Sequence, residues 1–110
     1  MEKFVKGDVE VVPFPFSDLT QAKRRPALIL SVLQGDDLVL CQITSQQIKD
    51  EYAVLIDDHY FDKGKLNQSS NVRPNRLFTA DGHIILYRVG HLKKIKLFQI
   101  VERVVKILRN

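Results

Sequence analysis

The sequence predicts a mainly β (α+β) fold, in which a small antiparallel barrel or strongly bent sheet is closed by a C-terminal α-helix. Short apolar or alternating runs separated by turn signals indicate about five to seven strands. The chain shows no alternation of strands with helices, so a parallel sheet is not expected. A bent antiparallel sheet covered by one helix is the simplest way to bury these apolar faces.

The first strand is expected over Asp8–Pro13, because Val9 and Val11 alternate with Asp8 and Glu10. This period of two residues is typical of a strand that buries one face. Prolines at positions 13 and 15 cannot donate a backbone hydrogen bond, so regular pairing is expected to stop there.

The second strand is expected over Ala27–Val32, which is apolar except for Ser31 and therefore resembles a strand buried on both faces. The cations Lys23–Arg25 precede it and are expected on a loop held by the first two strands. Loops supported by rigid strands are the usual place for residues that bind a ligand.

The remaining elements follow from turn signals and periodicity. Gln34–Asp37 and Asp81-Gly82 are the turn signals expected to end hairpins. An amphipathic helix is expected from Lys93 to about Leu108, since apolar residues recur there at helical spacing. The other expected strands are Leu38–Ile43, Tyr52–Ile56, one or two short strands near Val72 and Leu77-Phe78, and Ile84–Val89.

Length and composition point to one soluble domain over residues 1–110, with 45% hydrophobic and 27% charged residues. The sequence contains no membrane span and no signal-peptide core, so a cytoplasmic location is expected. Cys41, the single cysteine, lies in an apolar run and is expected to be a buried small residue. The net charge of +4 permits a nucleic-acid partner without requiring one.

Three polar stretches are candidates for binding an anion. Lys23-Arg24-Arg25 stands before Pro26, which favours an extended backbone at Arg25, so the two guanidiniums could clamp a phosphate. Thr44-Ser45-Gln46 offers hydroxyl and amide donors at a strand end, and Asn71–Arg76 is a second cationic group beside a proline. From charge alone, solvated turns explain these stretches equally well or better.

The three histidines, His59, His83 and His91, have no partners at the spacing of metal ligands. Each adjoins a turn signal or a strand end, so exposed loop histidines are the expected interpretation. The sequence also lacks phosphate-binding glycine loops and Cys-x-x-Cys pairs, so neither a metal nor another cofactor is expected.

Taken together and in this order, these stretches resemble the MazF/PemK family of toxins from type II toxin–antitoxin systems. The resemblance depends on Gly7-Asp8-Val9, on Val12–Phe16, on Lys23–Ser31, on Ile43–Gln46 and on Ser70–Phe78. It covers nearly the whole chain, and Gly90-His91-Leu92 before the helix also fits the pattern.

The resemblance implies an SH3-like antiparallel barrel that works as a homodimer and is held inactive by a cognate antitoxin protein. It also implies a metal-independent, sequence-selective endoribonuclease that cuts single-stranded mRNA, with Arg25 and Thr44 as the catalytic pair. Attack by the ribose 2′-hydroxyl of the RNA would need no metal-bound water. The residues expected to hold RNA phosphates are Lys23, Arg24, Ser45, Gln46, Arg73 and Arg76.

The sequence leaves open which group takes the proton from the attacking ribose 2′-hydroxyl. Arginine and threonine side chains are poor bases, so Arg25 is expected to act as an electrostatic stabiliser or proton donor, and His59 is one candidate base. Two other functions also remain: a toxin of the same fold that inhibits DNA gyrase, as the related CcdB toxins do, and a noncatalytic RNA-binding barrel.

Overall fold

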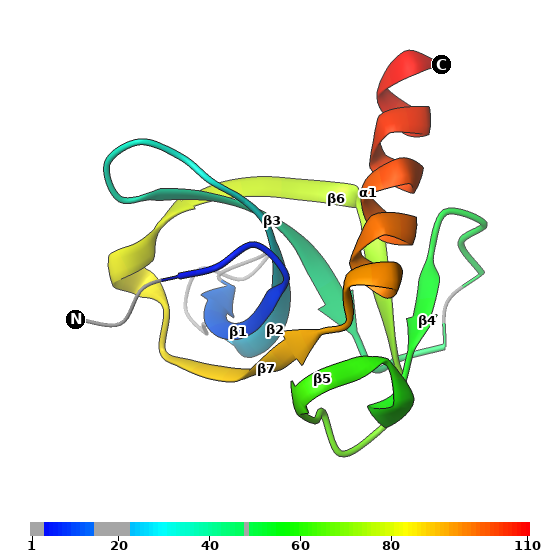
Figure 1. Ribbon diagram of the computed structural model, residues 1–110, viewed down its shortest axis with the longest axis horizontal. Helices are drawn as coiled ribbons and strands as arrows, with labels where there is room; N and C mark the ends of the chain where they lie inside the picture. The colour runs from blue at the N-terminus through cyan, green and yellow to red at the C-terminus, as the bar shows by residue number, and fades with distance from the viewer. Residues whose placement is uncertain (1–3, 15–22, 48) are drawn as a thin grey trace.

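A computed structural model describes residues 4–14, 23–47 and 49–110. Within those residues the chain forms strands, two short 3-10 helices and one α-helix (Figure 1). In chain order the elements are β1 (Asp8–Phe14), β2 (Lys23–Val32), β3 (Asp37–Thr44), β4 (Val54–Ile56), η1 (Asp58–Tyr60), β5 (Phe61–Gly64), β6 (Ser70–Asp81), η2 (Gly82–Ile84), β7 (Tyr87–Leu92) and α1 (Lys94–Arg109).

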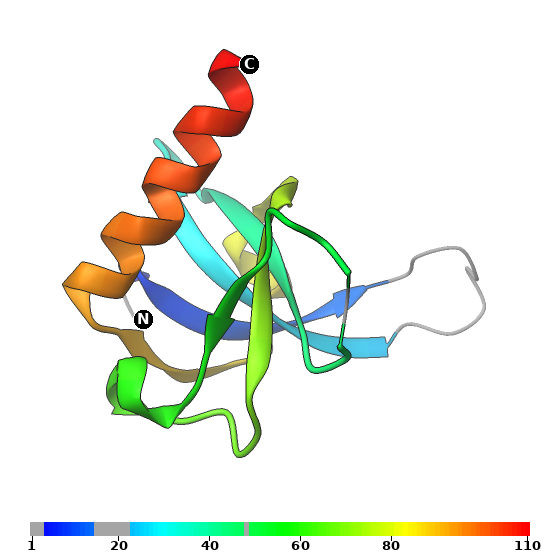
Figure 2. The ribbon, with the colours of Figure 1, turned by 90° about the vertical axis from the view of Figure 1, so that its right-hand side faces the viewer.

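The strands of the described chain form one antiparallel sheet with the order β4-β6-β3-β2-β1-β7-β5. Its two edge strands are consecutive in the sequence, because β4 ends at Ile56 and β5 begins at Phe61. Five residues span at most about 18 Å, so the two edges must approach each other. The sheet therefore curls into a half-barrel, and α1 packs along one side of it (Figures 1 and 2). This confirms the predicted fold class.

The prediction that Lys23–Arg25 lie on a loop was wrong, because all three belong to β2. Arg24 pairs with Pro13 and Arg25 pairs with Val12 across the β1–β2 ladder. Proline is tolerated in β1 because β7 pairs only with residues 8–11, so Pro13 lies beyond the part of β1 that has partners on both sides. Pro15 lies outside the described residues.

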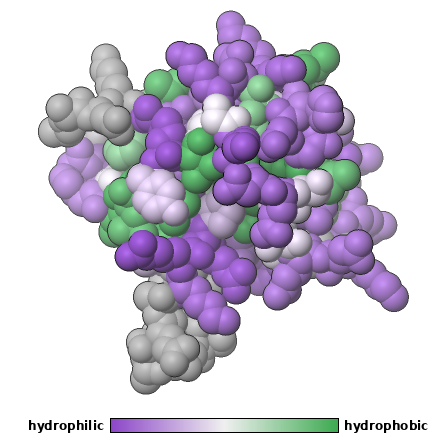
Figure 3. Space-filling view, turned by 90° about the horizontal axis from the view of Figure 1, so that it is seen from below, coloured by the Kyte–Doolittle hydropathy of each residue, from purple (hydrophilic) through white to green (hydrophobic). Residues whose placement is uncertain are grey.

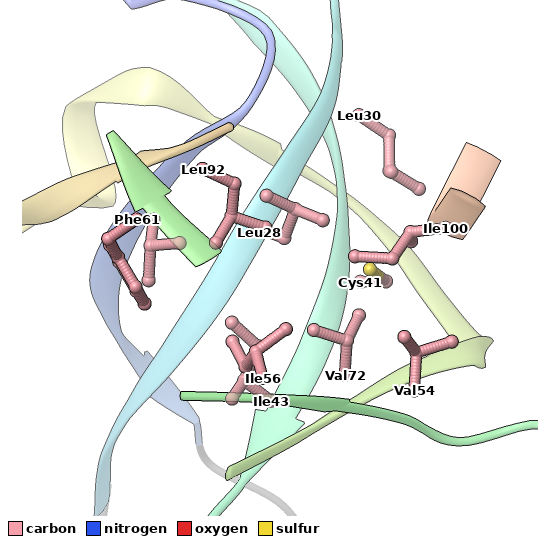
Figure 4. Close-up of a cluster of buried hydrophobic side chains, with 11 residues drawn as sticks. Leu28, Leu30, Cys41, Ile43, Val54, Ile56, Phe61, Val72, Leu92 and Ile100 are labelled. Atoms are coloured by element: carbon pink, nitrogen blue, oxygen red, sulfur yellow. The ribbon is translucent and has the colours of Figure 1, made fainter. Parts of the chain in front are cut away.

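The main core lies between the curled sheet and the helix. Its buried side chains come from the seven strands β1 to β7 and from α1, and Figure 4 shows them pointing into one shared interior. Leu28 and Ile100 are fully buried there, on β2 and on α1. Cys41 is buried in the same cluster, as predicted, and burial raises the pKa of its thiol to about 12.

The other face of β1 is also covered, which corrects the prediction of a half-buried strand. Asp8 and Glu10 are 3% and 1% exposed, because β1 separates the main core from a second apolar cluster that includes Val12. The Arg88 Nε lies 3.3 Å from Asp8 and 3.1 Å from Glu10. His91 Nδ1 lies 2.8 Å from the other Asp8 oxygen. These contacts satisfy the buried carboxylates and tie β1 to β7.

The second half of the sheet differs from the prediction in its strand boundaries. In place of short strands around Pro74, β6 is one strand of twelve residues that bulges where the pairing jumps from Cys41–Leu77 to Gln42–Arg73. The bulge accommodates the proline, which could not sit in a regular central ladder. A 3-10 helix occupies 82–84, so β7 begins at Tyr87 and not at the predicted Ile84.

The helix α1 confirms the predicted amphipathic segment, with a narrower buried face than expected. Ile100 is buried, whereas Phe98 and Leu108, which are among the apolar residues at helical spacing, are 65% and 70% exposed. Lys96 is covered as well, and its Nζ lies 4.0 Å from the centre of the Tyr60 ring. Among the described residues, no helix is long and apolar enough to cross a membrane.

Candidate functional site

Arg25 and Thr44 lie on the same face of the sheet. Ala27 pairs with Gln42 across the β2–β3 ladder, and side chains two residues apart along a strand share a face. Arg25 stands two residues before Ala27, and Thr44 stands two residues after Gln42. The paired part of this ladder ends at Ala27–Gln42, so Arg25 and Thr44 lie two residues beyond it, on one face and at neighbouring strand ends.

Thr44 is the last residue of β3 and is only 6% exposed. Its Oγ1 accepts a hydrogen bond of 3.2 Å from the Gln46 backbone N–H, which holds the hydroxyl in place at the strand end. Accepting this bond does not use the hydroxyl hydrogen, so Thr44 can still donate. Asn71 pairs with Thr44 across the β3–β6 ladder and adds an amide to the same face.

A pocket of about 490 Å³ opens beside this pair, on the opposite face of the sheet. Val11 pairs with Pro26 and with Tyr87, so these three side chains share the pocket face, and Arg24 is placed there by its position two residues before Pro26. The side chains of Arg24 and Arg25 therefore lie on opposite faces of β2. Arg25 nevertheless borders the pocket, because the pocket lies at the end of the strand. The other lining residues are Ile43, Ser45, Lys65, Leu66, Asn67, Gln68, Ser70 and Val89.

The side of the molecule on which β5 and β7 lie in Figure 1 is mostly hydrophilic. Figure 3 shows polar side chains over most of that surface, with smaller hydrophobic areas between them. A surface of this mixed kind can hold a ligand that has both charged and apolar parts.

The structure brings together only some of the predicted site residues. Arg24, Arg25 and Ser45 line the pocket, and Thr44 lies beside Ser45 on the other face. Gln46 is exposed, and its backbone carbonyl accepts a bond of 3.4 Å from Asn71 Nδ2. The pocket lining does not include Lys23, which is exposed at the start of β2, or Arg76, which is exposed in the β6 bulge.

Arg73 is separate from the pocket and is already paired. Its Nη2 lies 3.3 Å from Asp50 Oδ2, and both residues line a different depression. Partial burial acts to raise the pKa of Asp50. Hydrogen bonds from the Tyr52 backbone N–H and from the Arg73 and Asn75 side chains outweigh that effect and hold the pKa below its ordinary value.

None of the described histidines lines the pocket. His59 is highly exposed and lies 3.2 Å from Asp57, in a depression that shares Asn67 and Gln68 with the pocket. His59 therefore lies across the loop from 65 to 70 from the pocket.

The described residues include one group with the composition of a metal site, formed by Asp36, Asp81 and His83. All three are exposed, and Asp81 Oδ1 already accepts hydrogen bonds from the His83 backbone N–H and ring, at 2.8 and 2.7 Å. This arrangement caps η2. None of the three residues lines the pocket.

Sequence reasoning missed the residues that complete the pocket, above all Tyr87, Lys65, Asn67 and Gln68. No element was predicted over residues 65–69, and Tyr87 was predicted only as part of the strand Ile84–Val89. The backbone of Asn67 has φ +70°, a left-handed conformation that asparagine tolerates, so the polar run around it was the available turn signal.

Comparison with known proteins identifies the family and the fold. Residues 5–108 match the family described as PemK-like, MazF-like toxin of type II toxin-antitoxin system. No curated protein sequence matches the chain.

Three solved structures illustrate the shared fold. MazF from Deinococcus radiodurans (Form-I) has a TM-score of 0.79 at 19% identity, covering 100% of both chains. A mycobacterial endoribonuclease in complex with its cognate antitoxin has a TM-score of 0.77 at 14% identity, covering 97% of this chain and 96% of that one. The Mycobacterium tuberculosis toxin MazF-mt6 has a TM-score of 0.70 at 20% identity, covering 93% of this chain and 96% of that one.

Proposed function

Because the chain belongs to the PemK-like, MazF-like toxin family of type II toxin–antitoxin systems, we propose that it is an endoribonuclease that cuts single-stranded RNA. The observation that carries the proposal is that Arg25 and Thr44 share one face at the ends of the adjacent strands β2 and β3. A charged donor and a hydroxyl donor placed in this way can bind the same phosphate group.

In the reaction proposed, a ribose 2′-hydroxyl attacks the adjacent phosphorus and the bond from phosphorus to the 5′-oxygen of the next nucleotide breaks. The 2′-hydroxyl loses a proton and the departing 5′-oxygen gains one, so the products are a 2′,3′-cyclic phosphate and a 5′-hydroxyl. Negative charge builds on the phosphate oxygens in the transition state, and the Arg25 guanidinium and Thr44 hydroxyl stabilise that charge. Because the nucleophile belongs to the substrate, the reaction requires RNA and no metal-bound water. Arg24 and Ser45, at the same strand ends, would hold flanking phosphates.

The test is a cleavage assay on single-stranded RNA in EDTA, with Arg25→Ala compared with wild type. The variant is expected to lose on the order of a hundredfold or more in rate, because one donor to the transition-state charge is removed. Arg109→Ala is the matched control, since it removes one exposed arginine from the end of α1. Cleavage that survives Arg25→Ala at the wild-type rate, with the fold intact by circular dichroism, would rule out this site.

A cognate antitoxin is the partner that we propose for this chain. The mycobacterial relative was solved with its cognate antitoxin, and the cations of β2 offer an acidic segment the same charge that they offer RNA. Antitoxin peptide and RNA should then compete for the toxin. Simultaneous binding of both, measured by anisotropy with labelled RNA, would contradict a shared surface.

A further inference from the structure

The pocket beside the Arg25–Thr44 pair contains groups that a phosphate alone would not need. Its lining joins one aromatic ring, two side-chain amides, two hydroxyls and several aliphatic side chains with the cations. Tyr87 is 55% exposed although it belongs to a strand, so its ring is available to a ligand. An aromatic ring in this setting can stack on the flat face of a nucleobase.

The cations of the pocket differ from Arg73 and Arg88, which belong to other strands of the sheet. Arg73 and Arg88 are engaged by carboxylates. Within the described residues, Arg24 and Lys65 have no carboxylate partner, so their charge is available to the phosphate of a bound nucleotide.

The amides of Asn67 and Gln68 are available in the same way. The loop that carries them is held by the Ser70 hydroxyl, which donates a bond of 3.2 Å to the Gln68 backbone carbonyl. In the part of the chain that the structure describes, neither amide side chain has a hydrogen-bond partner. An amide offers both a donor and an acceptor, which is the pattern needed to read the polar edge of a base.

We propose that this pocket takes one nucleobase of the bound RNA, stacked on Tyr87 and read at its edge by Asn67 and Gln68. The volume of about 490 Å³ falls within the range of about 300–1,000 Å³ that is usual for pockets that bind small organic groups. Only an unpaired base can turn out of its strand into such a pocket, so the substrate is single-stranded. The proposal rests on the proposed function and assigns the sequence preference of cleavage to this pocket.

The test uses binding and not cleavage. The probes are two short labelled oligonucleotides with 2′-fluoro sugars, which lack the attacking hydroxyl, one carrying uracil at every position and one carrying no bases. Anisotropy is measured for wild type, Tyr87→Ala and Tyr87→Phe. Tyr52→Ala is the matched control, because Tyr52 is also exposed (38%) and does not line the pocket.

Wild-type protein should bind the base-containing strand more tightly than the abasic strand. Tyr87→Ala should weaken binding of the base-containing strand by roughly 5- to 150-fold, as expected for the loss of one stacking contact, and leave the abasic strand unaffected. Tyr87→Phe keeps the ring and should bind as wild type does. A purine version of the strand then reports which base the amides prefer.

The proposal is overturned if Tyr87→Ala binds the base-containing strand as well as wild type, if Tyr52→Ala weakens it equally, or if wild type does not distinguish the two strands. These outcomes are separate from failure of the nuclease. A protein that binds bases through Tyr87 and cuts no RNA would support the base pocket and contradict the proposed reaction. A nuclease whose binding does not depend on Tyr87 would support the reaction and contradict the base pocket.

Discussion

Arg73 Nη2 lies 3.3 Å from Asp50 Oδ2. One of the cations predicted to hold RNA phosphates is therefore neutralised by a carboxylate of its own chain. The ion pair leaves part of the Arg73 guanidinium without a hydrogen-bond partner among the described residues. Within the described residues the buried Arg73 Nε has no hydrogen-bond partner. A buried donor without an acceptor costs about 1–3 kcal/mol, so this guanidinium favours a second anionic or carbonyl group.

Asp50→Asn is therefore expected to tighten RNA binding. Removing the carboxylate charge frees Arg73 for one further phosphate, which should steepen the slope of log Kd against log salt by about 0.7 for a single strand. Asp62→Asn is the control, since it removes an exposed acidic charge on β5. An unchanged salt slope in Asp50→Asn would show that Arg73 does not contact RNA.

The lowered pKa of Asp50 also predicts that the free energy of unfolding depends on pH in the acidic range. The pKa of folded Asp50 lies below its ordinary value of 3.8, so its contribution to stability is present above the ordinary pKa. That contribution is lost as the pH falls through the lower folded pKa. The free energy of unfolding in urea should thus decline less between pH 6 and strong acid in Asp50→Asn than in wild type. Equal declines in the two proteins would contradict the assigned shift.

Gly64→Ala is expected to unfold or strongly destabilise the chain. Gly64 has φ +76°, and a Cβ there would lie 2.1 Å from the Val89 carbonyl oxygen in the β5–β7 pair. The matched control is Gly35→Ala, at φ +75° with no atom within 4 Å of the added Cβ. The control should cost only about 1–2 kcal/mol of backbone strain, and thermal unfolding compares the two variants. If the two variants lost equal stability, the destabilisation of Gly64→Ala would come from backbone strain and not from the close approach of the added Cβ to the Val89 carbonyl oxygen.

Thr44→Ala should lose on the order of a hundredfold in RNA cleavage, and Thr44→Ser should keep most of it, because only the hydroxyl is proposed to act on the phosphate. Thr79→Ala, at an exposed position on β6, serves as the control for loss of a threonine. Single-turnover rates separate this effect from binding. A Thr44→Ser variant as slow as Thr44→Ala would assign Thr44 a packing role only.

Much of this protein can be predicted from the sequence because the relevant signals are local. Alternation around Val9, the apolar run after Pro26 and the helical spacing up to Leu108 identify the element types. Their boundaries differ from the prediction where proline weakens the pattern. β2 begins at Lys23, and β6 runs past Pro74, because pairing with neighbouring strands outweighed the local signal.

The sequence alone determined the class of bent antiparallel sheet with a C-terminal helix, the cluster of cations before Pro26 and the hydroxyl at the end of the third strand. Only the tertiary structure decided that those cations belong to β2 and which groups surround them. The ladder register places Arg25 and Thr44 on one face of the sheet and Arg24 on the other, where residues from 65 to 70 and Tyr87 complete a pocket. The tertiary structure also pairs Arg73 with Asp50. These contacts join residues far apart in the chain, and a shift of one residue in register would reverse every face, so local periodicity could not specify them.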